Sequence, residues 1–199
     1  MDKALKNEII VFAGPNGSGK STITGYLQIN VDYVNADAIK KAISCTDLEA
    51  AIKATEMRES LLEENKSFAF ETVLSTERNL NFLRKAKEKD YFIKSYFIMT
   101  NDVSINISRI EQRVAKGGHG VPVDKIRSRF KKSIDNLKEL IKISDVCNVY
   151  DNSNTNIKRI FKKRKDVNYY NETHYWSKEK IMRLTGVEVM IEKDLNIFN

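Results

Sequence analysis

The chain has 199 residues, of which 41% are hydrophobic and 31% charged, and its formal net charge is +7. This length fits one domain or at most two, and the apolar content argues against global disorder. No apolar run approaches the ~20 residues of a membrane helix, and the charged first residues do not form a secretion signal, so we expect a cytoplasmic protein with no membrane partner. Cys45 and Cys147 lie far apart and fit a reducing compartment. The positive charge favours acidic partners such as nucleotides, phosphorylated metabolites or nucleic acid.

Short apolar stretches alternate with helical patterns along the chain. Strands are predicted at residues 8–13, 33–34, 67–73, 91–100 and 146–150. Helices are predicted at residues 20–27, 47–64, 76–89, 103–116 and 124–143, with Asp47 as the N-cap of the second. The alternation predicts an α/β protein with a mainly parallel, five-stranded sheet and right-handed crossovers.

The C-terminal part of the chain follows this pattern less clearly. We expect a core over residues 1–153 and an extension over 154–199 that packs on it. Within the extension, a hairpin is predicted near residues 158–170 and a final helix at 177–184.

One segment carries a complete phosphate-binding motif. Residues 14–21, Gly-Pro-Asn-Gly-Ser-Gly-Lys-Ser, match G-x-x-x-x-G-K-[ST] between an apolar strand and a helix. Glycines let backbone N–H groups point at phosphate oxygens, and the helix N-terminus adds the positive end of its dipole. Lys20 would reach the β- and γ-phosphates, and the Ser21 hydroxyl would bind Mg²⁺. The predicted nucleotide-binding residues are Gly14, Pro15, Asn16, Gly17, Ser18, Gly19, Lys20, Ser21 and Thr22.

The rest of the chain narrows the class of nucleotide-binding protein. It has no Asn-Lys-x-Asp segment for guanine selectivity and no apolar run that ends in Asp-Glu, and its length leaves little room for motor machinery. A small kinase fits these observations.

Further segments follow the loop in order: residues 34–37 (VNAD), 68–75 (FAFETVLS), the Arg- and Gly-rich stretch 109–129, and 150–153 (YDNS). Together with the loop, they resemble the zeta toxin family of P-loop kinases, in particular its chromosomal branch with a Gly-Gly-His lid. The resemblance implies a three-layer P-loop fold similar to nucleoside and shikimate kinases, with ATP and Mg²⁺ as cofactors. It also implies a small-molecule acceptor, for which the 3′-hydroxyl of UDP-N-acetylglucosamine is the candidate, and a small antitoxin protein as partner.

Three residues near predicted strand ends are candidates for substrate chemistry. Asp37 matches the family's catalytic aspartate and comes just after a strand, where the crevice of a parallel sheet opens. It would orient an acceptor hydroxyl and accept its proton, and an Asx turn or helix cap is the structural alternative. Glu71 and Thr72 match a family pair that holds the substrate. A structural hydrogen bond to a neighbouring loop is the alternative for Glu71.

The stretch 109–132 holds eight Lys or Arg residues against two acids. Arg109 and Arg113 are one helical turn apart, and three glycines follow them, so we expect a mobile lid around residues 113–129. By resemblance, Arg113 and Arg129 are the counterparts of the family's two lid arginines, which neutralise charge in the transition state. A solvated basic helix face is the alternative.

The predicted function is ATP-dependent transfer of the γ-phosphate to a hydroxyl of a small molecule. One alternative is another acceptor, such as a nucleoside, sugar acid or antibiotic. A second alternative, suggested by the basic run 158–165, is a nucleic-acid-end kinase or ATP-gated nucleic-acid binder. A third is a nucleotide-binding module without catalysis, against which Asp37 and the lid arginines argue. We favour the small-molecule acceptor over nucleic acid, because basic clusters are most often solvated faces. His119 is expected to pack within the lid, with a contact to the nucleotide as the alternative, and no metal-ligand spacing includes it.

Overall fold

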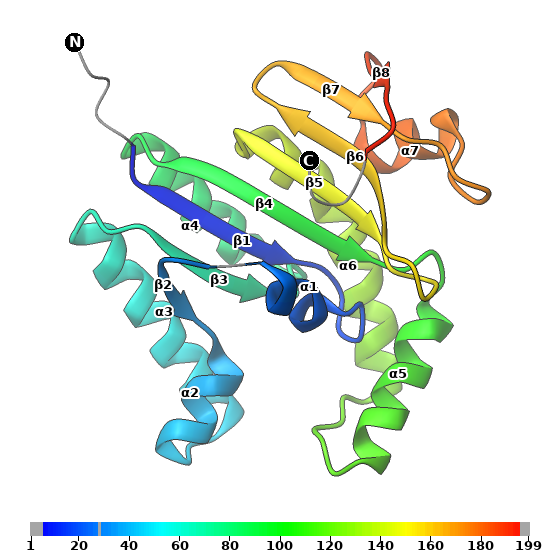
Figure 1. The fold of residues 1–199 in the computed structure, drawn as a ribbon. Helices are drawn as coiled ribbons and strands as arrows, with labels where there is room; N and C mark the ends of the chain where they lie inside the picture. Colours follow the sequence, from blue (N-terminus) through cyan, green and yellow to red (C-terminus); the bar gives the residue numbers. More distant parts are fainter. Residues whose placement is uncertain (1–5, 28, 196–199) are drawn as a thin grey trace.

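The computed structural model describes residues 6–27 and 29–195, which form one eight-stranded sheet with helices on both faces (Figure 1). The strand order is β2-β3-β1-β4-β5-β6-β7-β8. The strands are β1 Glu8–Ala13, β2 Asp32–Val34, β3 Phe68–Thr72, β4 Phe92–Met99, β5 Val146–Asp151, β6 Lys158–Arg164, β7 Val167–Tyr170 and β8 Ile191–Glu192. The five strands from β2 to β5 in this order are parallel, as the alternation predicted.

The prediction of five strands in the sheet is wrong, because the C-terminal region extends it. β6 and β7 form the predicted hairpin, and β6 pairs antiparallel with β5. β8 pairs parallel with β7. This last strand has only two residues, which is too short for an alternation of apolar and polar residues to be visible in the sequence.

The helices of the described residues are α1 Lys20–Tyr26, α2 Ala36–Ile43, α3 Asp47–Glu63, α4 Glu77–Glu88, α5 Val103–Ala115, α6 Val123–Ile143 and α7 Lys178–Thr185. For every helix except α2, both ends lie within one residue of the ends predicted from the sequence. The predicted cap of α3 is wrong: Thr46 is the N-cap, and it forms a capping box with Glu49. Over the residues that the structure describes, no helix is both long and apolar enough to cross a membrane.

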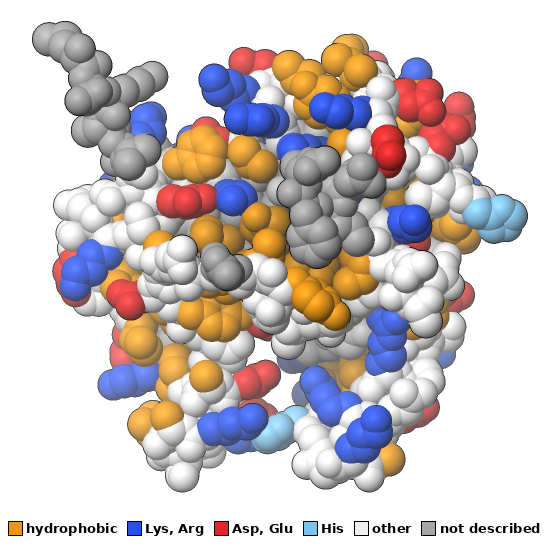
Figure 2. All heavy atoms as spheres, in the orientation of Figure 1, with side chains coloured by type: hydrophobic (Ala, Val, Ile, Leu, Met, Phe, Trp, Pro, Cys, Tyr) orange, Lys and Arg blue, Asp and Glu red, His pale blue; other side chains and the backbone are white. Residues whose placement is uncertain are grey.

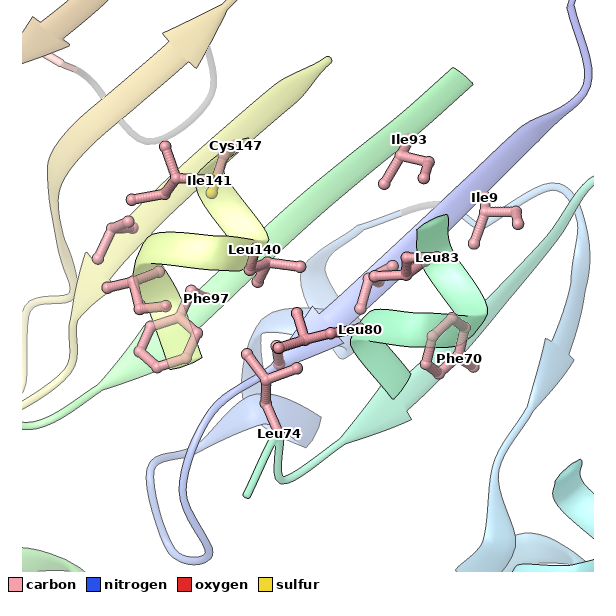
Figure 3. Close-up of a cluster of buried hydrophobic side chains, with 14 of the residues drawn as sticks. Ile9, Phe70, Leu74, Leu80, Leu83, Ile93, Phe97, Leu140, Ile141 and Cys147 are labelled. Carbon is pink, nitrogen blue, oxygen red and sulfur yellow. The ribbon is translucent and has the colours of Figure 1, made fainter. Parts of the chain in front are cut away.

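Most of the core lies on one face of the sheet, under α3, α4, α6 and α7. Figure 3 shows its centre, where Leu80 and Leu83 of α4 and Leu140 of α6 pack on the strands. The other face carries a smaller cluster, in which Ile23 of α1 packs with aromatic residues such as Tyr96. The face of the sheet that carries α1 is therefore covered by fewer helices than the opposite face.

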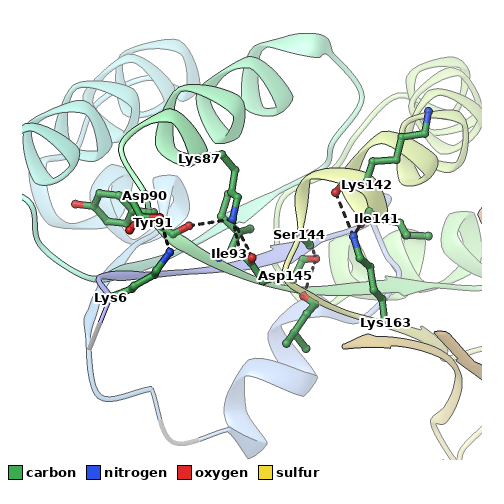
Figure 4. Close-up of polar contacts among 12 residues, drawn as sticks. Lys6, Lys87, Asp90, Tyr91, Ile93, Ile141, Lys142, Ser144, Asp145 and Lys163 are labelled. Atoms are coloured by element: carbon green, nitrogen blue, oxygen red, sulfur yellow. Dashed lines mark hydrogen bonds and ion pairs between the residues drawn. The ribbon is translucent and has the colours of Figure 1, made fainter. Parts of the chain in front are cut away.

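Charged side chains fix the end of the sheet where the parallel strands begin (Figure 4). Asp145 Oδ2 accepts hydrogen bonds from the Ile93 N–H and from Lys87 Nζ, both at 2.8 Å. Lys163 Nζ donates to the Ile141 carbonyl at 2.7 Å, at the C-terminal end of α6. These bonds hold β4, β5 and β6 in register. The register in turn fixes the positions of the carboxyl ends of β4 and β5.

Candidate functional site

The carboxyl ends of the parallel strands open onto a cleft of about 390 Å³. Its walls come from the phosphate-binding loop, α1, the start of α2, the end of β3 and one face of α5: Asn16, Gly17, Gly19, Lys20, Ser21, Thr22, Asn35, Ala36, Asp37, Glu71, Thr72, Val73, Arg109, Ile110 and Arg113. The cleft therefore brings together most of the predicted loop with Asp37, Glu71, Thr72 and Arg113. Gly14, Pro15 and Ser18 are buried beneath the loop surface, and Arg129 lies on α6, outside the lining.

The loop between β1 and α1 takes a path that only glycine allows, as two of its glycines illustrate. Gly14 has φ +140°, and a Cβ there would lie 1.9 Å from the carbonyl oxygen of Ile98. Gly19 has φ +91°, and a Cβ there would lie 2.2 Å from Nδ2 of Asn152. The glycines of the motif are thus required by backbone conformation and by the close approach of the neighbouring strand ends.

Two buried asparagines hold the loop in place. Asn106 of α5 donates from Nδ2 to the Asn16 carbonyl at 2.6 Å, and Asn152, directly after β5, donates from Nδ2 to the Ser18 carbonyl at 2.8 Å. Sequence reasoning missed both roles. The YDNS segment that contains Asn152 was part of the resemblance, but nothing local shows that its amide reaches the loop.

Lys20 has its ammonium inside the loop. Nζ donates to the carbonyl oxygens of Gly14 at 2.8 Å and Pro15 at 3.2 Å. Burial lowers the pKa of Lys20 to about 8, although the carboxylates of Glu71 and Asp37 favour the charged form. The ammonium is therefore held where a bound phosphate would stabilise its charge.

Asp37 lies in the first turn of α2 but does not cap it. The cap is Asn35, whose Oδ1 accepts the N–H groups of Asp37 at 2.8 Å and Ala38 at 3.1 Å. The alternative of Asp37 as a helix cap is wrong. Its carboxylate is exposed in the cleft and accepts no hydrogen bond from any residue that the structure describes. It is thus available to an acceptor hydroxyl.

Glu71 and Thr72 differ in how many hydrogen bonds their side chains already accept within the protein. The Glu71 carboxylate accepts a hydrogen bond from the Tyr33 hydroxyl. Burial raises the pKa of Tyr33, and the bond to Glu71 raises it further. Thr72 Oγ1 accepts from the Leu74 N–H at 2.9 Å and from Asn79 Nδ2 at 2.7 Å, so it holds the turn after β3. Only its own hydroxyl proton is left to donate.

Two arginines of α5 face the cleft. Arg113 Nε donates to the His119 carbonyl at 3.0 Å. Arg109 Nη1 is buried and has no hydrogen-bond partner in the described chain. A buried guanidinium N–H normally has a partner, so an unpartnered one on a residue that lines the cleft favours an anionic ligand there. The i, i+4 spacing predicted that Arg109 and Arg113 share one face of a helix. The family resemblance, however, did not single out Arg109 as a catalytic residue.

The lid contacts α2 across the mouth of the cleft. Nε2 of His119 lies 3.1 Å from Nζ of Lys40, which also donates to Asp47 Oδ1 at 2.6 Å. Figure 2 shows the hollow between these two parts of the molecule. His119 was expected to pack within the lid, but it reaches α2 instead.

The donor atoms of the cleft fit magnesium that arrives with a nucleotide. The Ser21 hydroxyl and the Asp37 carboxylate both line the cleft. Residues 6–27 and 29–195 contain no group of three His, Cys, Asp or Glu residues that could hold a metal by themselves. Mg²⁺ commonly takes one or two protein oxygens and completes its shell with phosphate oxygens and water.

Comparisons with known proteins agree with this geometry. The model of the zeta toxin family matches residues 2–166. A protein of Haemophilus influenzae, described as uncharacterized, is 31% identical over 132 residues, which are 63% of this chain and 94% of that protein.

Solved structures with the same fold are more distant in sequence. The AvrRxo1-ORF1:-ORF2 complex matches with a TM-score of 0.65 and 13% identity, over 90% of this chain and 64% of that one. The PezAT chromosomal toxin-antitoxin system of Streptococcus pneumoniae matches with a TM-score of 0.51 and 16% identity, over 76% and 70%. The Pnkp1/Rnl/Hen1 RNA repair complex matches with a TM-score of 0.56 and 18% identity, over 68% of this chain, which spans about half (46%) of that one. These likenesses confirm the predicted P-loop kinase fold, and the family match assigns the sequence: the chain belongs to the zeta toxin family of P-loop phosphotransferases.

Proposed function

We propose that the protein is a kinase that transfers the γ-phosphoryl group of ATP to a hydroxyl of a small molecule. The observation that carries this proposal is one cleft in which a phosphate-binding loop, a carboxylate without a structural role and two arginines meet. Membership of the zeta toxin family supports the same reaction class.

Each side chain has a definite task in this reaction. The loop N–H groups and Lys20 bind the phosphates, and Asp37 accepts the proton of the acceptor hydroxyl as its oxygen bonds to phosphorus and ADP leaves. Arg109 and Arg113 stabilise the charge that spreads over the transferring group. Mg²⁺, when bound with ATP at Ser21, neutralises the β- and γ-phosphate oxygens.

As the acceptor we propose the 3′-hydroxyl of UDP-N-acetylglucosamine, which the family resemblance implies. Glu71 and Thr72 line the cleft together with Asp37, and both offer groups that can bind sugar hydroxyls. The Tyr33 hydroxyl bonded to Glu71 would hold that carboxylate in one orientation.

We also propose a small antitoxin protein as a partner. One structurally similar protein is part of a chromosomal toxin-antitoxin system. Induced expression should arrest growth for the wild type and not for Asp37→Asn, and co-expression of the antitoxin should restore growth.

The proposed reaction is tested by ATP consumption over a panel of UDP-sugars, nucleosides and oligonucleotides. We expect Mg²⁺-dependent transfer to one small molecule, and a fall on the order of 10²–10⁴-fold for Asp37→Asn, the usual worth of general-base catalysis. The melting temperature and ATP affinity of this variant should match the wild type, because Asn35 caps α2. Full transfer by Asp37→Asn, or transfer to oligonucleotide ends only, would contradict the proposal.

A further inference from the structure

Two of the residues that line the cleft carry a buried polar atom without a hydrogen-bond partner among the described residues. These atoms are Oδ1 of Asn16 and Nη1 of Arg109. The Ser18 hydroxyl is a third such group of the phosphate-binding loop, but it is fully buried and does not line the cleft. The role proposed for Arg109, which binds the transferring phosphoryl group, leaves Asn16 Oδ1 without an explanation.

The backbone of Asn16 is held in place by α5. Asn106 Nδ2 donates to the Asn16 carbonyl oxygen at 2.6 Å, and Asn106 is itself fully buried and bonded to the Thr100 hydroxyl. The next residue of the loop, Gly17, lies so close to α5 that a Cβ there would be 2.7 Å from the Asn106 carbonyl oxygen. Asn16 is therefore fixed at the junction of the phosphate-binding loop and α5.

Asn16 and Arg109 lie on the same side of the cleft. Asn106, which binds the backbone of Asn16, is three residues before Arg109 on α5, so the two share a helix face. An amide oxygen accepts hydrogen bonds, whereas a guanidinium group only donates them. The two buried atoms have no bond to each other or to any other residue that the structure describes. One side of the cleft thus offers both an acceptor and a donor to a ligand.

The chemistry of the proposed reaction indicates which ligand group matches each atom. Phosphate oxygens accept hydrogen bonds, so they match Arg109 Nη1 and not an amide oxygen. The ionised triphosphate of ATP has no hydrogen-bond donor of its own. The acceptor molecule, in contrast, brings donors into the cleft: the reacting hydroxyl, whose proton passes to Asp37, and any hydroxyl or N–H group beside it.

We propose that Asn16 is a specificity-determining residue, which accepts a hydrogen bond from a second donor group of the acceptor, next to the hydroxyl that receives the phosphate. This inference rests on the proposed kinase function and narrows its acceptor to molecules with two adjacent donors, such as a vicinal diol or an acylated amino alcohol. UDP-N-acetylglucosamine fits this class, because an amide N–H and a second hydroxyl flank its 3′-hydroxyl. An analogue without the second donor would leave the buried amide oxygen unpaired, so the site should discriminate against it.

The test combines changes in the enzyme with changes in the acceptor, using the full chain with ATP and Mg²⁺. The acceptors are UDP-N-acetylglucosamine, its 4-deoxy analogue and UDP-2-deoxyglucose, and each analogue lacks one of the flanking donors. If the acceptor panel identifies another small molecule, analogues of it that lack a donor beside the reacting hydroxyl replace them.

The variant is Asn16→Ala, and the control is Asn30→Ala, at an exposed asparagine that does not line the cleft. Asn16→Ala keeps the backbone carbonyl that Asn106 binds, and Oδ1 has no partner among the described residues. The melting temperature of this variant should therefore match that of the wild type.

We expect the wild type and Asn30→Ala to lose about tenfold or more in kcat/KM with one of the two analogues. Asn16→Ala should lose less than about threefold with the same analogue, because the group that reads the donor is already absent. The ATP affinity of Asn16→Ala should equal that of the wild type.

Three results would overturn the inference. They are an equal loss in Asn16→Ala and the wild type, no loss in the wild type with either analogue, and a fall of about tenfold or more in the ATP affinity of Asn16→Ala. The last would mean that the amide binds the nucleotide or the water on its Mg²⁺. All three leave the proposed function standing, whereas a wild type that transfers phosphate to no small molecule would contradict both.

Discussion

At the scale of single residues, the charged groups of the site differ in whether they form hydrogen bonds within the protein. Lys20 is bonded to the carbonyl oxygens of its own loop, and Arg113 is bonded to the carbonyl oxygen of His119. Asp37 and the Arg109 Nη1 group have no such bond to the described residues. Asp37 and Arg109 can therefore act on substrates without giving up a hydrogen bond within the protein, whereas Lys20 and Arg113 must exchange one.

Lys20 predicts a proton linkage. With its pKa lowered to about 8, the ligand-free side chain is mostly neutral at about pH 9, and bound phosphates favour the ammonium form. ATP binding should therefore take up protons at about pH 9 and take up almost none through this group at about pH 6.5, where Lys20 is already charged. Calorimetry in buffers of different ionisation enthalpy measures the uptake. Lys20→Ala should remove it, and equal uptake by that variant would contradict the linkage.

The arginines predict a rank order in catalysis. Arg109→Ala should lower kcat by about 10²-fold or more, because it removes a preorganised donor from the cleft. Arg113→Ala should lower kcat more than it weakens ATP binding, since its charge is needed in the transition state. Arg129→Ala should have a smaller effect on kcat than Arg109→Ala. Single-turnover transfer measures all three, and a larger loss for Arg129 would mean that α6 moves toward the cleft during the reaction.

At the scale of elements, the lid and α2 are the two sides of the cleft mouth. α5 ends at Ala115 and α6 begins at Val123, and the residues between them carry His119 to Lys40. Residues 116–120 of this loop are all exposed, so few packing contacts oppose its movement. We therefore propose that the contact between His119 and Lys40 limits opening of this loop.

Removing that contact should weaken retention of the substrate. His119→Ala and Lys40→Ala should each raise KM for the acceptor several-fold, because the lid closes less often. The double variant should have a KM no higher than that of the more affected single variant, since both replacements delete the same contact between His119 and Lys40. Lys41→Ala, at the next exposed position of α2, is the control. Additive effects of the two replacements would show that they act independently.

At the scale of the whole molecule, the C-terminal region is joined to the site through the core. Trp176 Nε1 donates to Asp151 Oδ2 at 2.9 Å, and Asp151 precedes the asparagine that holds the phosphate-binding loop. Ile160, Phe161 and Ile181 have no exposed surface and belong to the main core cluster. We propose that the region after residue 153 is an extension packed on the kinase core and unfolds together with it.

Ile181→Ala tests this cooperative behaviour. The side chain is fully buried, so the replacement should lower the free energy of unfolding by about 2–5 kcal/mol. Denaturant unfolding should remain a single transition and shift as a whole. Val189→Ala, at a side chain that is 84% exposed, should change stability little. A separate early transition that leaves nucleotide binding intact would show an independent C-terminal unit.

The sequence by itself determined the parallel part of the sheet, six of the helices and the phosphate-binding loop. Each of these depends on residues close together in the chain: apolar runs, helical periodicity, and glycines at fixed spacing before Lys20. The family resemblance also selected Asp37, Glu71, Thr72 and Arg113, which the fold collects in one cleft.

Only the tertiary structure decided which distant side chains meet. The anchoring of the loop by Asn106 and Asn152 and the approach of His119 to Lys40 both join residues from different elements. Local sequence patterns predict the secondary structure and the buried face of each element. Contacts between side chains of different elements depend instead on strand order, register and helix packing. For the same reason Arg109 lines the cleft while Arg129, which the sequence motif favoured, lies on α6 outside it.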